Sequence, residues 1–322
     1  MKRLTAAVRS VAVVVAALAL AACEPLDDGG GAGVDGPLTF ESGFVFVRGS
    51  AGDVFLVNAS EPNVAQQLTT GGSARHPALS RDGRRVVFAR FSGTASELVT
   101  VGTAQGATPA VLLTAAGTGN GQNLRFPTFS PSGSTVVFVY DVGQTSFLGQ
   151  VNADGTGFTQ LAGSASRSYG APFFLRDGSA VLAPAGLSRL ELDGLDQVNL
   201  SPRTVFTLTN NLNSNSEGSL TVVNRVVLSP DGTRLAFDAR SSAGVTRVYV
   251  AAFSGSVVQP AERLSSESEG EETFPTWTSA ASVGLSSNLG GQDNVYTASA
   301  TALRGSLILA VPSAREPWFG PL

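Results

Sequence analysis

The sequence predicts an all-β fold, a six-bladed β-propeller built from four-stranded antiparallel blades. Three observations support this prediction. One hairpin segment recurs along the chain with spacings of about 40 to 54 residues, a period typical of propeller blades. Each copy places turn-forming residues between two short runs of strand-forming residues. Beyond the first two dozen residues, the sequence has no sustained helical periodicity.

The clearest copy of the hairpin is R-V-V-L-S-P-D-G-T-R-L-A-F-D-A-R, at Arg225–Arg240. Its Ser-Pro-Asp-Gly suits a type I turn, because Pro fixes φ at the second position and Gly takes the positive φ that closes a bulged hairpin. The Leu-Ala-Phe run that follows is apolar and favours a strand. The related copies are His76–Arg90, Phe126–Tyr140, Ala171–Ala185 and Phe274–Ser287.

The first 22 residues have the pattern of a secretory leader, with Lys2, Arg3 and Arg9 in front of an apolar run. Leu-Ala-Ala-Cys at positions 20–23 matches the lipobox of bacterial lipoproteins, which predicts cleavage before Cys23 and lipidation of its thiol. The alternative is an ordinary signal peptide with an incidental cysteine. A lipidated cysteine carries enough acyl chains for stable membrane anchoring.

A Gly-rich polar stretch at 23–36 follows the leader and is predicted to be a flexible tether. Glu24 comes directly after Cys23, and by resemblance to the enterobacterial sorting rule this favours the outer membrane. We therefore expect a lipid-anchored protein of the cell envelope, facing either the periplasm or the cell surface. The propeller is predicted to occupy 37–322.

Aligning the copies on the turn glycine gives one anchor position per blade, six residues before the glycine. The anchors are Pro37, Pro77, Pro127, Pro172, Val226 and Pro275. The third copy shows a whole blade, with strands at 127–130, 135–141, 147–152 and 158–161. Large side chains recur at equivalent positions and are predicted to pack between blades. These core residues are Phe88, Phe129, Phe138, Phe237 and Trp277.

The last residues, 312–322, are predicted to form a tail after the sixth blade, with Trp318 and Phe319 covering the junction between the first and last blades. A docking peptide is the alternative interpretation of this tail. The sequence leaves open whether a strand shared between the two ends of the chain closes the ring.

The hairpins carry a family resemblance. P-x-[FLW]-S-P-D-G, the turn V-N-A-D-G-T-G at 151–157 and the Leu-Thr that ends several repeats resemble the WD40-like repeat of TolB-type β-propellers. The resemblance spans 37–322 and implies the propeller fold. TolB itself has an α/β domain before its propeller and no lipid anchor, so the resemblance implies neither identity with TolB nor its partners, such as Pal or TolA.

Composition excludes several classes of function. The chain has 21 Lys and Arg against 25 Asp and Glu, and removing the leader changes the net charge from −4 to −7, because three basic residues leave with it. An acidic balance without a basic stripe argues against a nucleic-acid partner. The single cysteine excludes an internal disulfide, and the only lysine, Lys2, is in the leader, so a Schiff base is excluded. We expect a monomer.

Loops that lead into the innermost strands of a propeller meet at one end of its central channel. Here they carry basic, polar and acidic residues, which we predict to form a partner-binding mouth. The residues are Arg75, His76, Arg125, Tyr169, Asn224, Arg225, Glu269, Glu271 and Glu272. Converging guanidinium groups suit carboxylates or phosphates. The alternative is that the arginines pair with the glutamates and close the channel.

The residues for catalysis are lacking. His76 is the only histidine, the sequence has no G-x-S-x-G nucleophile motif, and no second His or free Cys supports a transition-metal site. We therefore expect no catalytic residue, no metal and no cofactor. The favoured hypothesis is a non-enzymatic envelope lipoprotein that binds a protein or peptide at the channel mouth. The alternatives are a small-ligand or glycan-binding or -processing propeller of lyase or hydrolase type, and a scaffold that binds through its outer blade faces.

Overall fold

The computed structural model describes residues 40–93, 95–164, 167–185, 191–196, 202–206, 213–214, 216–254 and 257–322. The predicted leader, the lipidation at Cys23 and the tether at 23–36 lie outside these residues. Residues 37–322 form one compact unit. No helix in the described part of the chain is long and apolar enough to span a membrane.

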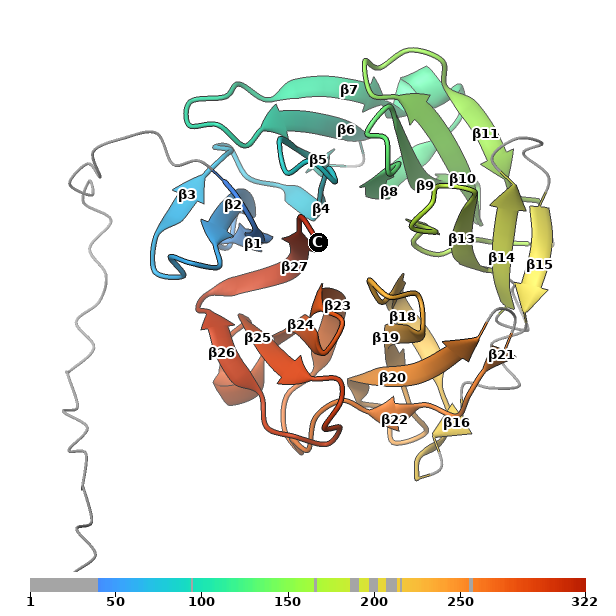
Figure 1. Cartoon of the computed structure of the whole chain (residues 1–322). Coiled ribbons are helices and arrows are strands. Elements are labelled where there is room, and N and C mark those ends of the chain that lie inside the picture. Colours follow the sequence, from blue (N-terminus) through green and yellow to red (C-terminus); the bar gives the residue numbers. More distant parts are fainter. Residues whose placement is uncertain are drawn as a thin grey trace, which may run out of the picture. The chain divides into compact units, whose positions relative to one another are not determined.

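Six antiparallel sheets surround a common centre, which confirms the six-bladed propeller (Figure 1). The first blade has the order β27 (Ala314–Gly320), β1 (Gly43–Arg48), β2 (Asp53–Asn58) and β3 (Ala65–Gln67). The second has β4 (Ala74–Leu79), β5 (Arg85–Ser92), β6 (Ala95–Gly102) and β7 (Ala110–Thr114), followed by the 3-10 helix η1 (Ala115–Thr118). The third has β8 (Gln122–Phe129), β9 (Thr135–Val142), β10 (Thr145–Asn152) and β11 (Thr159–Ala162).

The remaining blades follow the same plan. The fourth has β12 (Phe173–Phe174), β13 (Ala180–Ala185), β14 (Glu191–Asp196) and β15 (Pro202–Phe206). The fifth has β18 (Thr221–Leu228), β19 (Arg234–Arg240), β20 (Thr246–Ser254), β21 (Val257–Val258) and β22 (Glu262–Arg263), the last pairing with β20. The sixth has β23 (Glu272–Ser279), β24 (Ser282–Ser287), the 3-10 helix η3 (Leu289–Gly291), β25 (Asn294–Ser299) and β26 (Ile308–Val311). A small hairpin joins β16 (Asn213–Ser214) to β17 (Gly218–Ser219).

The recurring turn folds as the sequence predicts. In the fifth blade, Gly232 has φ 73° and its N–H donates to the carbonyl of Ser229. The Ser229 hydroxyl donates to Asp231 at 2.5 Å, and Asp231 accepts the N–H of Thr233 at 3.1 Å. These hydrogen bonds, with that of Ser229 the strongest, lower the pKa of Asp231 to about 2. The turn therefore needs the Asp side chain as well as the Gly backbone.

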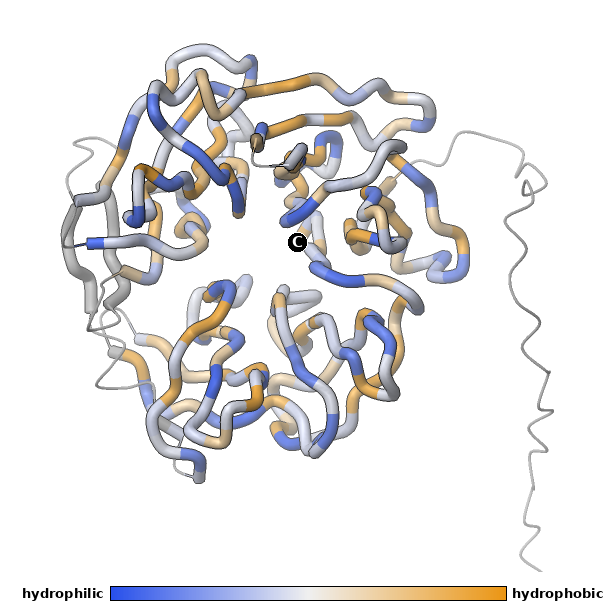
Figure 2. The backbone as a smooth tube through the Cα atoms, turned by 180° about the vertical axis from the view of Figure 1, so that it is seen from behind, coloured by the Kyte–Doolittle hydropathy of each residue, from blue (hydrophilic) through white to orange (hydrophobic). Residues whose placement is uncertain are grey.

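Apolar strand residues pack between neighbouring blades, and the hydropathy of the backbone shows apolar strands joined by more polar turns (Figure 2). All five predicted core residues are buried, with Phe138 and Phe237 fully so. Edge-strand exposure is limited because each sheet is flanked by another. The core therefore follows the repeat-equivalent positions.

The ring is closed by the C-terminal strand, which corrects the predicted tail. β27 pairs with β1, with Val45 opposite Trp318 and Phe44 opposite Phe319, and the C-terminus lies at the centre of the ring in both backbone views (Figures 1 and 2). The innermost strand of the first blade is therefore β27, and Gly43 begins its second strand. The anchor of that blade is Pro317, where the alignment had placed Pro37. One blade built from both ends of the chain removes the open edge of the first blade.

Candidate functional site

The residue before each anchor lies at the central channel. These six residues are His76, Phe126, Ala171, Arg225, Phe274 and Glu316. Four of them have a positive φ of 51–54°, which is uncommon for residues other than glycine. The strand register is broken at the same four places, and such β-bulges redirect a side chain. The innermost strands are therefore bent where they meet the channel.

Side chains from five blades meet at this level. The His76 ring centroid lies 4.0 Å from that of Phe126 and 5.9 Å from that of Phe274. The Arg225 guanidinium lies 5.5 Å from the Phe274 ring and 5.4 Å from the Trp318 ring. Together with Ala171 of the fourth blade, they enclose a cavity of ≈ 20 Å³. They form a plug, which we call the channel plug, between the two ends of the channel.

Arg225 connects three blades from inside the plug. Its side chain is buried, and its Nη2 donates to the carbonyl of Phe274 at 2.8 Å and to the carbonyl of Pro317. Burial lowers the pKa of Arg225 to about 10, so the group stays charged at neutral pH. A residue predicted for an open mouth thus works as a buried crosslink of the fifth, sixth and first blades.

Asp238 of β19 holds the backbone beside Arg225, and the hairpin pattern did not single it out. Its carboxylate is 0 % exposed and accepts the N–H groups of Asn224, Arg225 and Phe274 at 2.9–3.0 Å. The Asn224 side-chain amide donates to it at 2.7 Å. Six residues after their turn glycines, the second and third blades carry Ala89 and Val139 instead. The sequence signal that could have identified Asp238 is an acidic residue within the otherwise apolar run L-A-F-D-A.

Glu316 of β27 is a second buried acid at the channel, missed because its segment was interpreted as a tail. Its Oε2 accepts the His76 N–H at 2.6 Å, and its Oε1 lies 3.7 Å from Arg75 Nε and 4.0 Å from Arg315 Nε. Burial raises the pKa of Glu316. Burial also lowers the pKa of His76 to about 3, aided by the positive charge of Arg225. His76 is therefore neutral at physiological pH.

Glu316→Gln is expected to remove a pH dependence of stability. Since the pKa of Glu316 is raised on folding, its contribution to stability is complete below the pKa of an unfolded glutamate and is lost as pH rises through the folded pKa. The advantage of the wild type over Glu316→Gln should therefore decrease between pH 4 and pH 7, measured by urea unfolding. An advantage that grows with pH would mean that the ion pairs with Arg75 and Arg315 outweigh burial.

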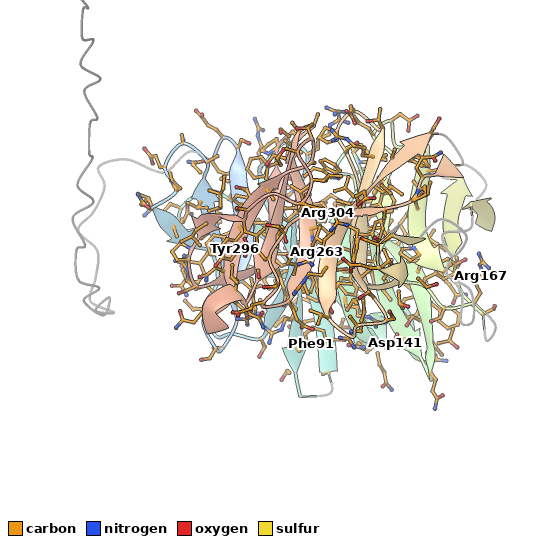
Figure 3. The ribbon with its side chains drawn as sticks, turned by 90° about the horizontal axis from the view of Figure 1, so that it is seen from below. Phe91, Asp141, Arg167, Arg263, Tyr296 and Arg304 are labelled. Atoms are coloured by element: carbon orange, nitrogen blue, oxygen red, sulfur yellow. The ribbon has the colours of Figure 1, made fainter. Side chains whose placement is uncertain are left out.

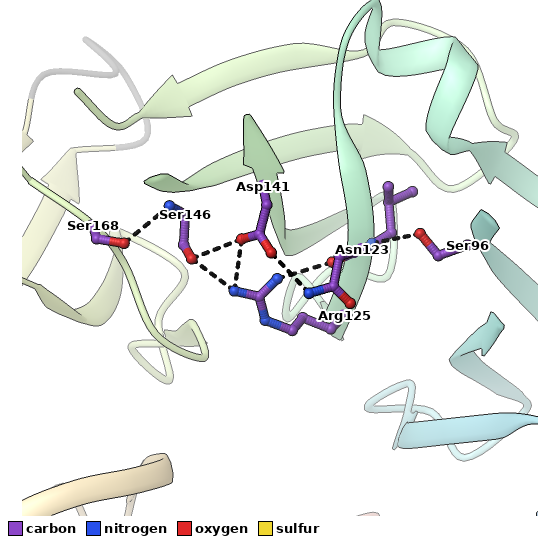
Figure 4. Close-up of polar contacts among 7 residues, drawn as sticks. Ser96, Asn123, Arg125, Asp141, Ser146 and Ser168 are labelled. Atoms are coloured by element: carbon purple, nitrogen blue, oxygen red, sulfur yellow. Dashed lines mark hydrogen bonds and ion pairs between the residues drawn. The ribbon is translucent and has the colours of Figure 1, made fainter. Parts of the chain in front are cut away.

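Arg125 turns back into its own blade (Figure 4). Its Nη2 lies 2.8 Å from Asp141 Oδ1 and donates to Ser146 Oγ at 2.7 Å, while its Nη1 donates to the carbonyl of Asn123 at 2.9 Å. Seen from the side, Asp141 and Phe91 lie at the same face of the disc (Figure 3). Arg125 therefore belongs to the rim of this face and has its carboxylate partner within the third blade.

The other residues of the predicted mouth do not form one surface either. Tyr169 is packed in the core between the third and fourth blades. Glu272 is buried, accepts the Val248 N–H at 3.1 Å, and has its pKa raised by burial. Glu269 and Glu271 are exposed, with Glu271 3.9 Å from Arg240. Within the described residues, the acidic run makes no ion pair with Arg75, Arg125 or Arg225, so the alternative of a salt-bridged closure is not what the structure shows.

The larger concavity lies at the opposite end of the channel, where the hairpin turns gather. β4 has Arg75 at its start and Arg81 just beyond its end, and a strand rise of about 3.3 Å per residue separates these positions by about 20 Å. At the turn end, a cavity of ≈ 230 Å³ opens above the plug; we call it the turn-end cavity. Its lining includes the aromatic residues Phe129, Phe173, Phe174, Trp277, Trp318 and Phe319.

Two arginines cross the rim of the turn-end cavity. Arg81 Nη1 of the second blade donates to the carbonyl of Arg176 in the fourth blade at 3.1 Å, and Arg176 Nη1 donates to the carbonyl of Pro230 in the fifth. Both arginines are exposed. In the third and fifth blades, Pro fills the turn position that these arginines occupy. The difference is visible in the sequence, but turn chemistry alone gave no reason to assign a function to it.

A metal ion requires a set of ligand side chains that lie close together. Across the described residues, no group of three or more His, Cys, Asp or Glu side chains is placed to hold a metal ion. The arrangement offers an aromatic concavity with guanidinium groups at its rim, and a buried plug beneath it.

Comparisons with known proteins agree with this architecture. The family model of the lipoprotein LpqB beta-propeller domain matches residues 54–316. TolB from Acinetobacter baumannii is similar in fold, with a TM-score of 0.62 and 14% identity over 88% of this chain and 67% of that chain. Putative TolB from Agrobacterium tumefaciens is similar with a TM-score of 0.54 and 14% identity, over 87% of this chain and 98% of that chain. Hydrazine synthase from Kuenenia stuttgartiensis is similar with a TM-score of 0.65 and 12% identity, over 88% of this chain and 47% of that chain. No curated protein matches the chain.

Proposed function

This chain belongs to the lipoprotein LpqB beta-propeller domain family, and on that premise we propose that it is a non-enzymatic envelope lipoprotein that binds a protein or peptide partner. The partner-binding site is the turn-end cavity, not the arginine-bearing mouth that the sequence predicts. The observation that carries this proposal is a concavity of ≈ 230 Å³ with aromatic walls and two exposed arginines at its rim. Aromatic residues and Arg are the side chains enriched at protein interfaces.

The cavity chemistry defines the partner segment. Aromatic walls favour an apolar side chain that leaves water on binding. The guanidinium groups of Arg81 and Arg176 now donate to neutral carbonyls, and a carboxylate would give them charge-assisted hydrogen bonds. The segment is therefore apolar at its tip and carries an acidic residue that reaches the rim.

The double charge reversal Arg81→Glu with Arg176→Glu is expected to weaken such a peptide at least about tenfold, since each rim charge changes from attractive to repulsive. Peptides are first enriched by phage display against the wild-type protein, and their Kd is then measured by fluorescence anisotropy. Arg84→Glu is the matched control, because Arg84 is exposed on the same turn as Arg81 but does not line the cavity. Failure to enrich any peptide, or equal Kd values in all three proteins, would contradict the proposal.

The proposal includes no catalytic role. The sole histidine, His76, lies against the rings of Phe126 and Phe274, and its pKa of about 3 leaves it a weak base. A general base has to reach the proton that it removes from a substrate. His76 lies inside the channel plug, beneath the turn-end cavity. These features favour binding over the glycan-processing alternative.

Anchoring through Cys23 completes the proposal and places the propeller at the envelope, with the outer membrane favoured by Glu24. A chain held at the membrane by acyl groups is released when the acylated thiol is lost. Cys23→Ser is therefore expected to move the protein from the membrane fraction to the soluble fraction, followed by immunoblotting. Retention of the variant in the membrane fraction would argue for an ordinary signal peptide and a different means of attachment.

A further inference from the structure

Two arginine side chains lie across the opening of the turn-end cavity. The third blade lies between the second and the fourth and packs against both (Figure 1). Arg81 Nη1 of the second blade nevertheless donates to the carbonyl of Arg176 in the fourth, at 3.1 Å. Since both arginines line the cavity, the Arg81 side chain passes the third blade on the channel side. Arg176 Nη1 continues to the carbonyl of Pro230, so the opening is crossed from the second blade to the fifth.

The backbone beneath each arginine is held in place by its own turn. In the second blade, Asp82 accepts the Ser80 hydroxyl at 2.6 Å and the Arg84 N–H at 3.1 Å. In the fourth blade, Asp177 accepts the N–H of Ser179 at 3.0 Å and its hydroxyl at 2.8 Å. These hydrogen bonds fix the turns, whereas exposed side chains change rotamer rapidly. Movement at the opening is therefore movement of the two arginine side chains alone.

The hydrogen bonds that hold the two guanidinium groups across the opening are made to neutral oxygens. Within the described residues, neither Arg81 nor Arg176 pairs with a carboxylate. A hydrogen bond from a guanidinium to a carboxylate is roughly twice as strong as one between neutral groups. A ligand that carries a carboxylate can therefore replace both bonds with stronger ones. A neutral apolar ligand has to break them and offers nothing in return.

We propose that Arg81 and Arg176 form an arginine gate over the turn-end cavity, closed in the free protein and opened by a carboxylate of the ligand. The inference rests on the proposed function and adds selection to it: apolar segments with an acidic residue enter, and neutral ones are disfavoured. The apparent affinity of a gated site falls with the fraction of protein in which the gate is open. A neutral ligand meets this cost in full, while an acidic ligand offsets it through charge-assisted hydrogen bonds.

The double substitution Arg81→Pro with Arg176→Pro removes the gate and keeps the turns. Pro131 and Pro230 already occupy the equivalent position in the third and fifth blades. Pro suits this second position of the turn because its φ is fixed near the value that the turn requires. Within the described residues, the backbone N–H of neither arginine donates a hydrogen bond that Pro would remove. The variant is therefore expected to fold like the wild type.

The probes are 3-phenylpropionate and its neutral amide, titrated into the protein and followed by tryptophan fluorescence. The only two tryptophans of the chain, Trp277 and Trp318, both line the cavity and report its occupancy. The double variant should bind the amide at least about threefold more tightly than the wild type does, and the carboxylate at least about tenfold more weakly. Arg84→Ala should match the wild type with both probes, because Arg84 is exposed on the same turn as Arg81 but does not line the cavity.

The outcomes separate the gate from the site beneath it. Equal Kd values of the amide for the wild type and the double variant would show that the arginines act only as fixed charges, and would overturn the gate while the cavity remains a binding site. Binding of neither probe to either protein would contradict the proposed function itself. In wild-type crystals soaked with 3-phenylpropionate, both guanidinium groups should have left the carbonyls of Arg176 and Pro230 for the ligand. Guanidinium groups that stay on those carbonyls beside a bound ligand would also overturn the gate.

Discussion

A chain ending at Ser313 is expected to lose the folded propeller altogether, rather than to lose one strand from it. The truncation removes β27, which supplies the innermost strand of the first blade and, through the Phe319 N–H to Thr276 and the Glu316 N–H to Ser286, bonds to the sixth. Trp318 and Phe319 are partly buried, so loss of each side chain should cost less than the about 3–5 kcal/mol of a fully buried aromatic residue, but it adds to the loss of the β1–β27 ladder, against a typical total stability of about 5–15 kcal/mol. Circular dichroism melting should show no cooperative transition at 25 °C or above.

Ending the chain at Pro321 is the matched control, because Leu322 is half exposed and lies outside β27. This chain should melt within a few degrees of the full-length protein. A synthetic peptide of residues 312–322, added to the chain that ends at Ser313, should restore part of the cooperative transition by occupying the open edge of β1. A truncated chain that melts cooperatively near the wild-type Tm would show that the ring closes without its last strand.

The closure could not be read from the sequence because the hairpin spacing fits the start of the propeller and not the strand that closes it. Pro37 and Gly43 satisfy the spacing of a first hairpin, while Pro317 is not followed by the turn glycine that marks the other anchors. Gly43 in fact begins the second strand of its blade, opposite Asn58. A Cβ at Gly43 would lie 1.9 Å from the Val57 carbonyl oxygen, so this glycine serves close strand approach rather than a turn.

The candidate site shows what alignment gives and what it omits. Spacing placed Arg75, Arg125 and Arg225 in the loops before the innermost strands, whereas the structure includes all three in those strands, β4, β8 and β18. It could not give side-chain direction, which is set by local partners: Asp141 and Ser146 draw Arg125 into its own blade, and the bulge before Val226 leads Arg225 into the plug. Arg225 also stands one position later than the other two, at the register of His76.

The turn-end cavity was missed for a different reason. The Ser-Pro-Asp-Gly turns have a sufficient structural explanation, so their residues attracted no functional interpretation. Only the assembled ring shows that the turns of four blades and the end of β27 surround one concavity. Hydrophobic periodicity predicts which residues are buried, but the space left between blades depends on side chains contributed by all of them.

Asp238→Ala is expected to destabilise the protein by about 3–5 kcal/mol, the cost of removing one partner from a buried hydrogen-bonded charge network. The substitution leaves the backbone N–H groups of Asn224, Arg225 and Phe274 without their acceptor, and it withdraws a negative charge from the neighbourhood of the Arg225 guanidinium. Phe274 belongs to the sixth blade. The substitution therefore weakens both the fifth blade itself and its contact with the sixth. Urea unfolding at pH 7 gives the free energy.

Asp141→Ala is the matched control, because it also removes a carboxylate that pairs with arginine, but at the face of the disc, where the Asp141 side chain keeps 22 % of its exposure. Its cost should be about 1–3 kcal/mol, below that of Asp238→Ala, because water can reach the groups left without their partner. Asp238→Asn should fall between the two, since one amide oxygen still accepts backbone N–H groups while the charge is lost. Equal losses for Asp238→Ala and Asp141→Ala would mean that water replaces the buried carboxylate. The backbone of the fifth blade would then be held by its β-ladder alone, and the buried charge of Arg225 would need no fixed carboxylate nearby.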